Sequence, residues 1–127
     1  FLCSQRADGL IIASPTGSTA YALSAGGPIL HPALNATVLV PMFAHTLTSR
    51  PLVIGGQHTI RLSLIEDDIA SPGLSCDGQT RIPVNQNCDI RINQNCHDLS
   101  LIHPEHYNYF ETLRSKLHWG NQLTDFA

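Results

Sequence analysis

Charge is scarce in this 127-residue sequence, since Asp, Glu, Lys and Arg together make up only 13% of it. Lys116 is the only lysine, the arginines are scattered singly, and the formal net charge is −3. Nucleic-acid binders neutralise phosphates with a basic stripe, so nucleic acid is excluded as a partner. The hydrophobic fraction of 43% excludes a disordered tail. So low a content of charged residues leads us to expect that something else covers part of the surface.

Long apolar runs are also missing. None approaches the roughly 20 residues that span a bilayer, and no signal-peptide pattern is present, so we expect no membrane partner. The four cysteines, Cys3, Cys76, Cys88 and Cys96, form no C-x-x-C pair of the kind that binds zinc or carries out redox chemistry. We interpret them as reduced structural thiols that pack as small hydrophobic groups, in a cytoplasmic protein.

Several catalytic signatures are absent as well. The loop at 15–19 contains no lysine and therefore is not a Walker A loop, and no G-x-G-x-x-G occurs. The segment 22–26 (ALSAG) lacks the first glycine of a nucleophile elbow, and Ser24 falls inside an expected helix, so a serine hydrolase is disfavoured. Among the seven histidines, His97, His103 and His106 are the nearest set, but their spacing predicts no metal site.

What is present begins with a strand, a loop and a short helix. The apolar run 10–14 (LIIAS) ends at Pro15 and predicts a buried strand. Good helix formers over 19–25 predict a short helix that Gly26 and Gly27 stop, with Ser18 or Thr16 as its N-cap.

Short strand candidates follow at 37–41, 50–54, 58–65, 74–76, 81–84, 89–93 and 99–102, with turn signals at Gly55-Gly56 and Asp77-Gly78. Glu66-Asp67-Asp68 reads as a solvated hairpin tip, with an acidic metal site as the minor alternative. Pro104 opens a final helix ending at Gly120, with an apolar stripe that can pack on a sheet, namely Tyr107, Phe110, Leu113 and Leu117. We therefore expect one mainly β domain over 1–127, an antiparallel sandwich with a short N-terminal and a C-terminal helix.

Two spots suggest ligand binding. In the segment 8–21 a strand leads through small and hydroxyl residues to a helix N-terminus, where unpaired N–H groups face outward. Tyr21 in the first helical turn offers a flat face for a nucleobase; the alternative is an ordinary core tyrosine. At 76–79 (CDGQ), Asp-Gly favours a turn with positive φ, which either serves as a turn only or presents a carboxylate and an amide to a polar ligand.

These segments resemble a known family. The run 8–21 (DGLIIASPTGSTAY), followed by 24–28 (SAGGP), is similar to the signature of NAD kinases. The stretches 45–54 (HTLTSRPLVI) and 75–79 (SCDGQ) resemble later blocks of the same family in the same order. The resemblance covers nearly the whole chain and is strongest to the bacterial, cytoplasmic branch.

The resemblance implies a C-terminal, NAD-binding and oligomerisation domain. NAD kinases transfer a phosphoryl group from ATP or polyphosphate, with Mg²⁺, to the 2′-hydroxyl of the adenosine ribose of NAD, giving NADP. They are homo-oligomers, dimers or tetramers, of an N-terminal α/β and a C-terminal β-rich domain. The Gly-Gly-Asp-Gly motif with the expected base, and the Asn-Glu pair that holds the ribose, lie in the other domain and do not occur here. We therefore expect no catalytic residue in this chain, no metal ligand, and no activity of the fragment alone.

The family's NAD-contact positions carry over to nine residues: Arg6, Asp8, Thr19, Ala20, Tyr21, Ala22, Leu23, Ser24 and Gln79. By this resemblance Tyr21 stacks on the adenine, Thr19 and Ser24 make polar contacts, and Asp8 in some members reaches across a subunit interface. Thr16 and Asp77 lie in matching blocks as second-tier candidates. Two alternatives stay open: a domain of a related diacylglycerol-type lipid kinase, and a non-catalytic β-sandwich interaction module.

Overall fold

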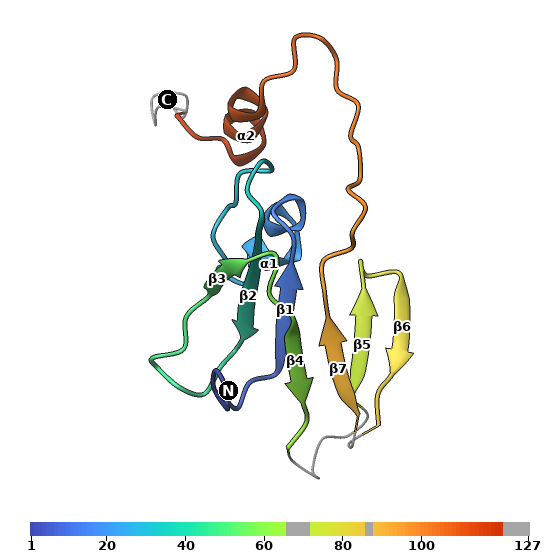
Figure 1. Cartoon of the computed structure of the whole chain (residues 1–127). Coiled ribbons are helices and arrows are strands. Elements are labelled where there is room, and N and C mark those ends of the chain that lie inside the picture. The colour runs from blue at the N-terminus through green and yellow to red at the C-terminus, as the bar shows by residue number, and fades with distance from the viewer. Residues whose placement is uncertain (66–71, 86–87, 121–127) are drawn as a thin grey trace. The chain divides into compact units, whose positions relative to one another are not determined.

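The computed structural model describes residues 1–65, 72–85 and 88–120 (Figure 1). The chain divides into two compact units, Phe1–Asn95 and Cys96–Ala127, which are treated separately below. The acidic segment Glu66-Asp67-Asp68, read above as a hairpin tip, lies outside the described residues. No described helix is long and apolar enough to cross a membrane.

The first unit contains three antiparallel sheets, and its helical segments are short. Strands β1 (Gly9–Ala13), β2 (Ala36–Met42) and β3 (Leu52–Gly55) form one sheet with β2 in the centre. Strand β4 (Ile60–Ser63) pairs with β7 (Asp89–Ile92), and β5 (Gly73–Cys76) pairs with β6 (Thr80–Pro83). The expected mainly β, antiparallel class is confirmed, and six of the predicted later strands are present with shifted ends.

The core lies on one face of the central sheet. Because side chains alternate along a strand, Val38 and Val40 point to the same face of β2, and both are fully buried. Ala22 and Leu30 complete this cluster from the segment that follows β1. Ile11 and Ala13, which pair with Val40 and Val38 across the ladder, pack against it. The core therefore fastens the helical segment after β1 onto the sheet.

Three local expectations were wrong. The helix predicted over 19–25 is instead a 3₁₀ turn, η1 (Thr16–Thr19), followed by α1 (Tyr21–Ser24), and neither Thr16 nor Ser18 caps it. Residues 99–102 form no strand, since no described strand pairs with them to complete a ladder. All four cysteines are free, as expected, but they are exposed, so they do not pack as small core groups.

The second unit carries helix α2 (Tyr109–Leu117). It begins later than predicted because the Asn108 side chain accepts hydrogen bonds from the N–H groups of Phe110 (2.9 Å) and Glu111 (3.2 Å), which makes Asn108 the N-cap. It ends at His118, whose φ of 55° stops the helix just before Gly120. No residue of α2 is fully buried, and Tyr109, Leu113 and Leu117 are half-buried. The packing of its apolar stripe on a sheet stays a prediction.

Candidate functional site

The loop between β1 and α1 is held by a series of hydrogen bonds between residues close in sequence. The N–H of Gly17 donates to Ser14 Oγ (3.3 Å), and the hydroxyl of Thr19 donates to the carbonyl of Thr16 (3.2 Å). The N–H of Ser18 donates to the carbonyls of Ser14 (2.9 Å) and Pro15 (3.2 Å). These bonds use the polar groups of small residues internally, and so they fix the backbone of the loop without any large side chain.

Ser18 joins this loop to a distant segment. Its side chain is fully buried; the hydroxyl donates to the carbonyl of Pro15 (2.5 Å) and accepts from the N–H of Leu30 (2.9 Å). Leu30 is twelve residues further along and belongs to the core cluster. The sequence suggested Ser18 as a helix cap; instead its hydroxyl connects the two ends of the segment that contains α1.

Helix α1 ends in a tight turn of two glycines. Gly26 has a φ of 83° and its N–H donates to the carbonyl of Leu23 (3.0 Å), while the N–H of Gly27 donates to that of Ala22 (2.8 Å). This pair of bonds is the Schellman motif. A Cβ on Gly27 would lie 2.8 Å from both the Ala22 oxygen and Val40 Cγ2, so only glycine fits between α1 and β2.

The predicted binding segment has an outer and an inner side. Tyr21 is 69% exposed, which excludes the alternative of a core tyrosine. Thr16, Thr19, Ala20 and Ser24 are also exposed, and Leu23 is half-buried. Ala22 is only 1% exposed, so its side chain faces the core and has no surface for a ligand. Ala22 thus holds the helix on the core, while the Tyr21 ring and the side chains of Thr19 and Ser24 are exposed to solvent.

Arg6 and Asp8 precede β1 and continue its ladder. The N–H of Asp8 donates to the carbonyl of Met42 (3.0 Å), and the N–H of His45 donates to that of Arg6 (3.0 Å). The backbone of this segment is therefore fixed against the chain that leaves β2, and both side chains remain exposed.

Asp77 and Gln79 lie at the turn between β5 and β6. Asp77 and Gly78 both have positive φ, 50° and 69°, and the N–H of Gln79 donates to the carbonyl of Cys76 (3.0 Å). The predicted Asp-Gly turn is confirmed. Both side chains are exposed, on a different sheet from the one that carries α1.

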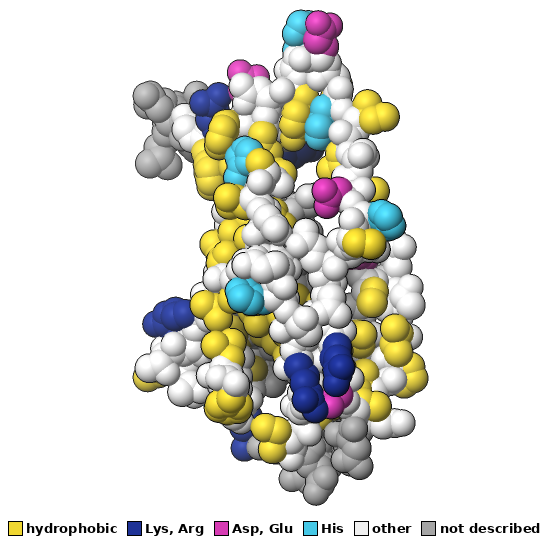
Figure 2. All heavy atoms as spheres, viewed as in Figure 1, with side chains coloured by type: hydrophobic (Ala, Val, Ile, Leu, Met, Phe, Trp, Pro, Cys, Tyr) yellow, Lys and Arg dark blue, Asp and Glu magenta, His cyan; other side chains and the backbone are white. Residues whose placement is uncertain are grey.

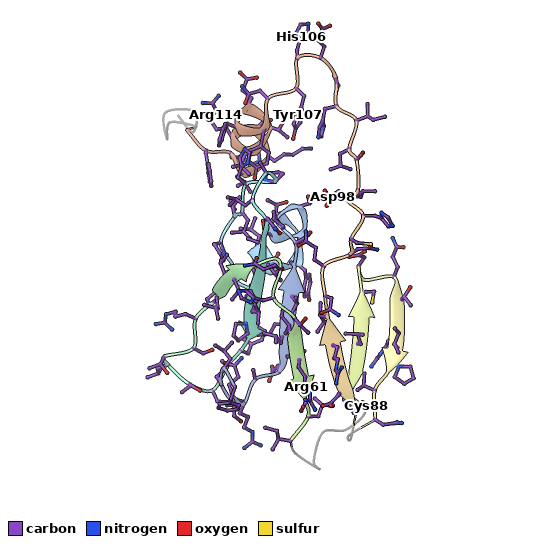
Figure 3. All side chains as sticks on the ribbon, viewed as in Figure 1. Arg61, Cys88, Asp98, His106, Tyr107 and Arg114 are labelled. Atoms are coloured by element: carbon purple, nitrogen blue, oxygen red, sulfur yellow. The ribbon has the colours of Figure 1, made fainter. Side chains whose placement is uncertain are left out.

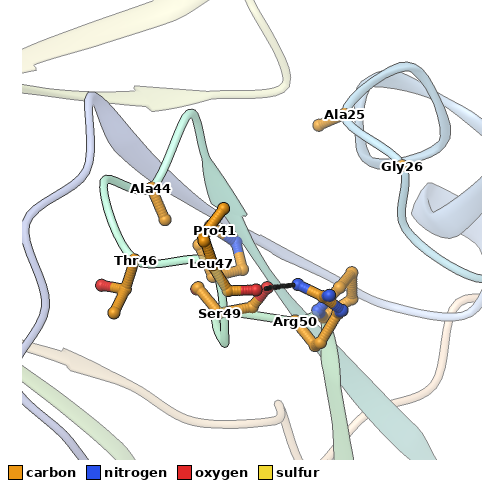
Figure 4. A pocket seen from close by; sticks show the side chains of 9 residues that line it. Ala25, Gly26, Pro41, Ala44, Thr46, Leu47, Ser49 and Arg50 are labelled. Atoms are coloured by element: carbon orange, nitrogen blue, oxygen red, sulfur yellow. Dashed lines mark hydrogen bonds between the residues drawn. The ribbon is translucent and has the colours of Figure 1, made fainter.

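An open hollow of about 350 Å³ lies beside the end of α1 (Figure 4). Ala25 and Gly26 line one side, and the other side is formed by Pro41, Ala44 and residues of the 46–51 segment. There Nη1 of Arg50 donates to the carbonyls of Leu47 and Ser49, both at 2.7 Å. Sequence reasoning matched this segment to a family block but assigned it no role. The one sequence feature that could have marked this segment as the wall of a hollow is its run of small and polar residues before Arg50-Pro51.

Outside this region, the carboxyl group of Asp89 on the β4–β7 sheet has a shifted pKa. On the β4–β7 sheet Arg61 and Arg91 are direct cross-strand partners, and Asp89 is paired with Ser63. The Asp89 carboxylate accepts from the guanidinium of Arg61 and from the Ser63 hydroxyl (2.9 Å). Figure 3 labels the Arg61 side chain, which comes from β4. These hydrogen bonds, with the nearby charges of both arginines, lower the pKa of Asp89 below its usual 3.8. Its charge offsets the repulsion between two arginines that face each other.

Comparison with known proteins connects these features. Residues 1–104 match the family model described as the ATP-NAD kinase C-terminal domain. An NAD kinase of Photobacterium profundum is 54% identical over 123 residues, which is 97% of this chain and 42% of that protein. The chain therefore spans about two-fifths of the length of such curated relatives.

Two solved structures share the fold. A yeast NADH kinase complexed with NADH superposes with a TM-score of 0.77 at 26% identity, covering 96% of this chain and 38% of that one. An NAD kinase from Archaeoglobus fulgidus in complex with ATP gives a TM-score of 0.61 at 31% identity, covering 72% of this chain and 34% of that one. With most of its length matched by the family model, this chain belongs to the ATP-NAD kinase C-terminal domain family.

Proposed function

We propose that the full-length protein transfers a phosphoryl group from ATP to the 2′-hydroxyl of the adenosine ribose of NAD, and that this chain binds the NAD. The observation that carries the proposal is the exposed ring of Tyr21, on a helix held between a hydrogen-bonded loop and a glycine turn, in the segment that matches the family signature. A ring held in this way offers a preformed stacking face for a base. The family match favours neither a lipid kinase nor a non-catalytic module.

The residues around Tyr21 have different roles in the proposed binding of NAD. Tyr21 stacks on the adenine, and the hydroxyls of Thr19 and Ser24, whose side chains are also exposed, supply polar contacts. Ala20 and Leu23 add backbone and edge contacts, with Thr16 as a second-tier partner. Ala22 belongs to the core, so we assign it the role of holding the helix rather than touching the nucleotide.

The remaining candidates imply a larger assembly. We propose that Arg6 and Gln79 complete the NAD contacts, with Asp77 in second rank, and that Asp8 acts across a subunit interface in a homodimer or homotetramer. Hydrophobic side chains visible on the surface in Figure 2 support such interfaces. Exposed examples in the first unit are Phe43, Leu47, Leu52 and Val53. Large apolar patches commonly mark sites of protein association.

Donor and metal belong to the wider proposal. We propose ATP or polyphosphate as the donor, and a cytoplasmic enzyme. Phosphoryl transfer depends mainly on positioning and charge neutralisation, and Mg²⁺ supplies part of the latter at the donor phosphates. Within residues 1–65, 72–85 and 88–120, no three His, Cys, Asp or Glu side chains gather to hold an ion. We therefore assign no step to a metal here, and we place the catalytic base outside this chain.

Steady-state kinetics of the full-length protein test the role of Tyr21. Removing the ring in Tyr21→Ala should raise the KM for NAD by roughly 5- to 150-fold, since base–aromatic stacking contributes about 1–3 kcal/mol. Tyr21→Phe keeps the stacking face and should stay near wild type. Tyr107→Ala, at another exposed tyrosine, is the control for loss of an aromatic ring. A KM for NAD that Tyr21→Ala leaves unchanged would contradict the proposal.

A further inference from the structure

Ser18 has a role that its position in the signature does not explain. Among the described residues it is the only polar residue that is buried, with no exposed surface. A hydroxyl is costly to bury unless it is hydrogen-bonded, and here it makes two hydrogen bonds, to the carbonyl of Pro15 and from the N–H of Leu30. The other side-chain hydrogen bonds of the loop are local and exposed. Ser18 therefore provides the long-range, buried link of this loop.

That link fixes a helix too short to hold its own position. Helix α1 has four residues, far below the length at which an isolated helix is stable in water. Its placement depends on its two ends. The turn at Gly26 and Gly27 holds the C-terminal end against β2, and the Ser18 hydroxyl holds the entry to the helix against the returning chain at Leu30.

We propose that Ser18 is a positioning residue for the NAD acceptor. Its hydroxyl fixes the loop so that Thr19 and Tyr21, one and three residues further along, already have their binding orientation before the nucleotide arrives. Without it, NAD must order the loop on binding, and the cost of that ordering weakens its affinity. This inference rests on the proposed function, because it names how the same site is held in place; Ser18 itself is buried and does not touch NAD.

Kinetics of the full-length enzyme separate positioning from simple stability. Ser18→Ala should raise the KM for NAD about 5-fold, the scale of one net hydrogen bond. It should leave the KM for ATP unchanged and kcat at saturating NAD within about 2-fold. Ile60→Val trims a buried side chain in the β4–β7 sheet and serves as the destabilised control, with unchanged KM values. Equal melting losses in both variants, with the KM for NAD unchanged in Ser18→Ala, would overturn the proposal.

Two further measurements cover other outcomes. Ser18→Cys keeps a larger atom with weaker hydrogen bonding at this position, so its KM for NAD should rise above that of wild type, and this variant tests the role of the hydroxyl if the alanine variant folds poorly. Amide hydrogen exchange without ligand should accelerate over residues 16–24 in Ser18→Cys and not in Ile60→Val. If the wild-type enzyme does not phosphorylate NAD, the proposed function fails and the acceptor role of Ser18 fails with it. An active wild type whose Ser18 variants show unchanged exchange and KM refutes Ser18 alone.

Discussion

Replacing Gly27 by alanine tests how α1 is seated on the sheet. The new Cβ would stand 2.8 Å from the backbone oxygen of Ala22 and 2.8 Å from Val40 Cγ2, closer than such atoms approach in real structures. One obstacle is backbone and the other is a fully buried side chain in the centre of β2, so neither can move aside cheaply. Inserting a methyl group into such a site costs about 1–3 kcal/mol.

Thermal unfolding of the full-length protein measures this cost. At about 4 °C per kcal/mol for a domain of this size, Gly27→Ala should lower the Tm of the transition that involves this domain by roughly 4–12 °C. Gly9→Ala is the matched control, because its Cβ meets only Met42 Sδ at 3.5 Å, an ordinary contact. If the Tm of Gly27→Ala equals that of Gly9→Ala, α1 does not pack on β2 as closely as the Gly27 contacts indicate.

The remaining predictions concern other parts of the chain. Asn108→Ala removes the N-cap of α2 and should lower the stability of this helix by about 1 kcal/mol. Circular dichroism or amide exchange over the C-terminal segment measures this loss, and Asn108→Asp, which is also a good N-cap, should keep the helix as stable as in wild type. Asp89→Asn should slightly destabilise the protein at neutral pH. Because folding lowers the pKa of Asp89, its contribution is complete above its ordinary pKa of 3.8 and disappears as the pH falls through the lower folded value. The difference in urea midpoint between wild type and Asp89→Asn should therefore vanish in strong acid. If the difference persists there, the destabilisation does not come from loss of the Asp89 charge.

Local patterns predicted much of the fold. Alternating residues such as those of 59–64 and 89–92 correctly marked the β4 and β7 strands, and Asp77-Gly78 marked a turn with positive φ. These predictions succeeded because strand alternation and turn conformation are properties of a few adjacent residues. Likewise Gly26-Gly27 correctly marked the end of the first helix.

The failures share a dependence on distant partners. Ser18 was read as a cap because hydroxyls favour helix starts, but its hydroxyl bonds to Leu30, twelve residues away. Residues 99–102 have strand-like composition, yet a strand also needs a neighbour to pair with, and none of the described strands supplies one. The exposure of Tyr21 could not be decided from local pattern either, because its helix packs through Ala22 onto β2.

The most direct test of the central claim is the product made by the full-length protein from NAD and ATP. We predict a dinucleotide phosphorylated on the 2′-hydroxyl of the adenosine ribose, identified by chromatography and ³¹P NMR, and slower formation of this product at sub-saturating NAD when the Tyr21 ring is removed. The isolated 127-residue chain should make none. Phosphorylation of diacylglycerol in place of NAD, or a Tyr21→Ala enzyme that uses NAD as well as wild type does, would contradict the account.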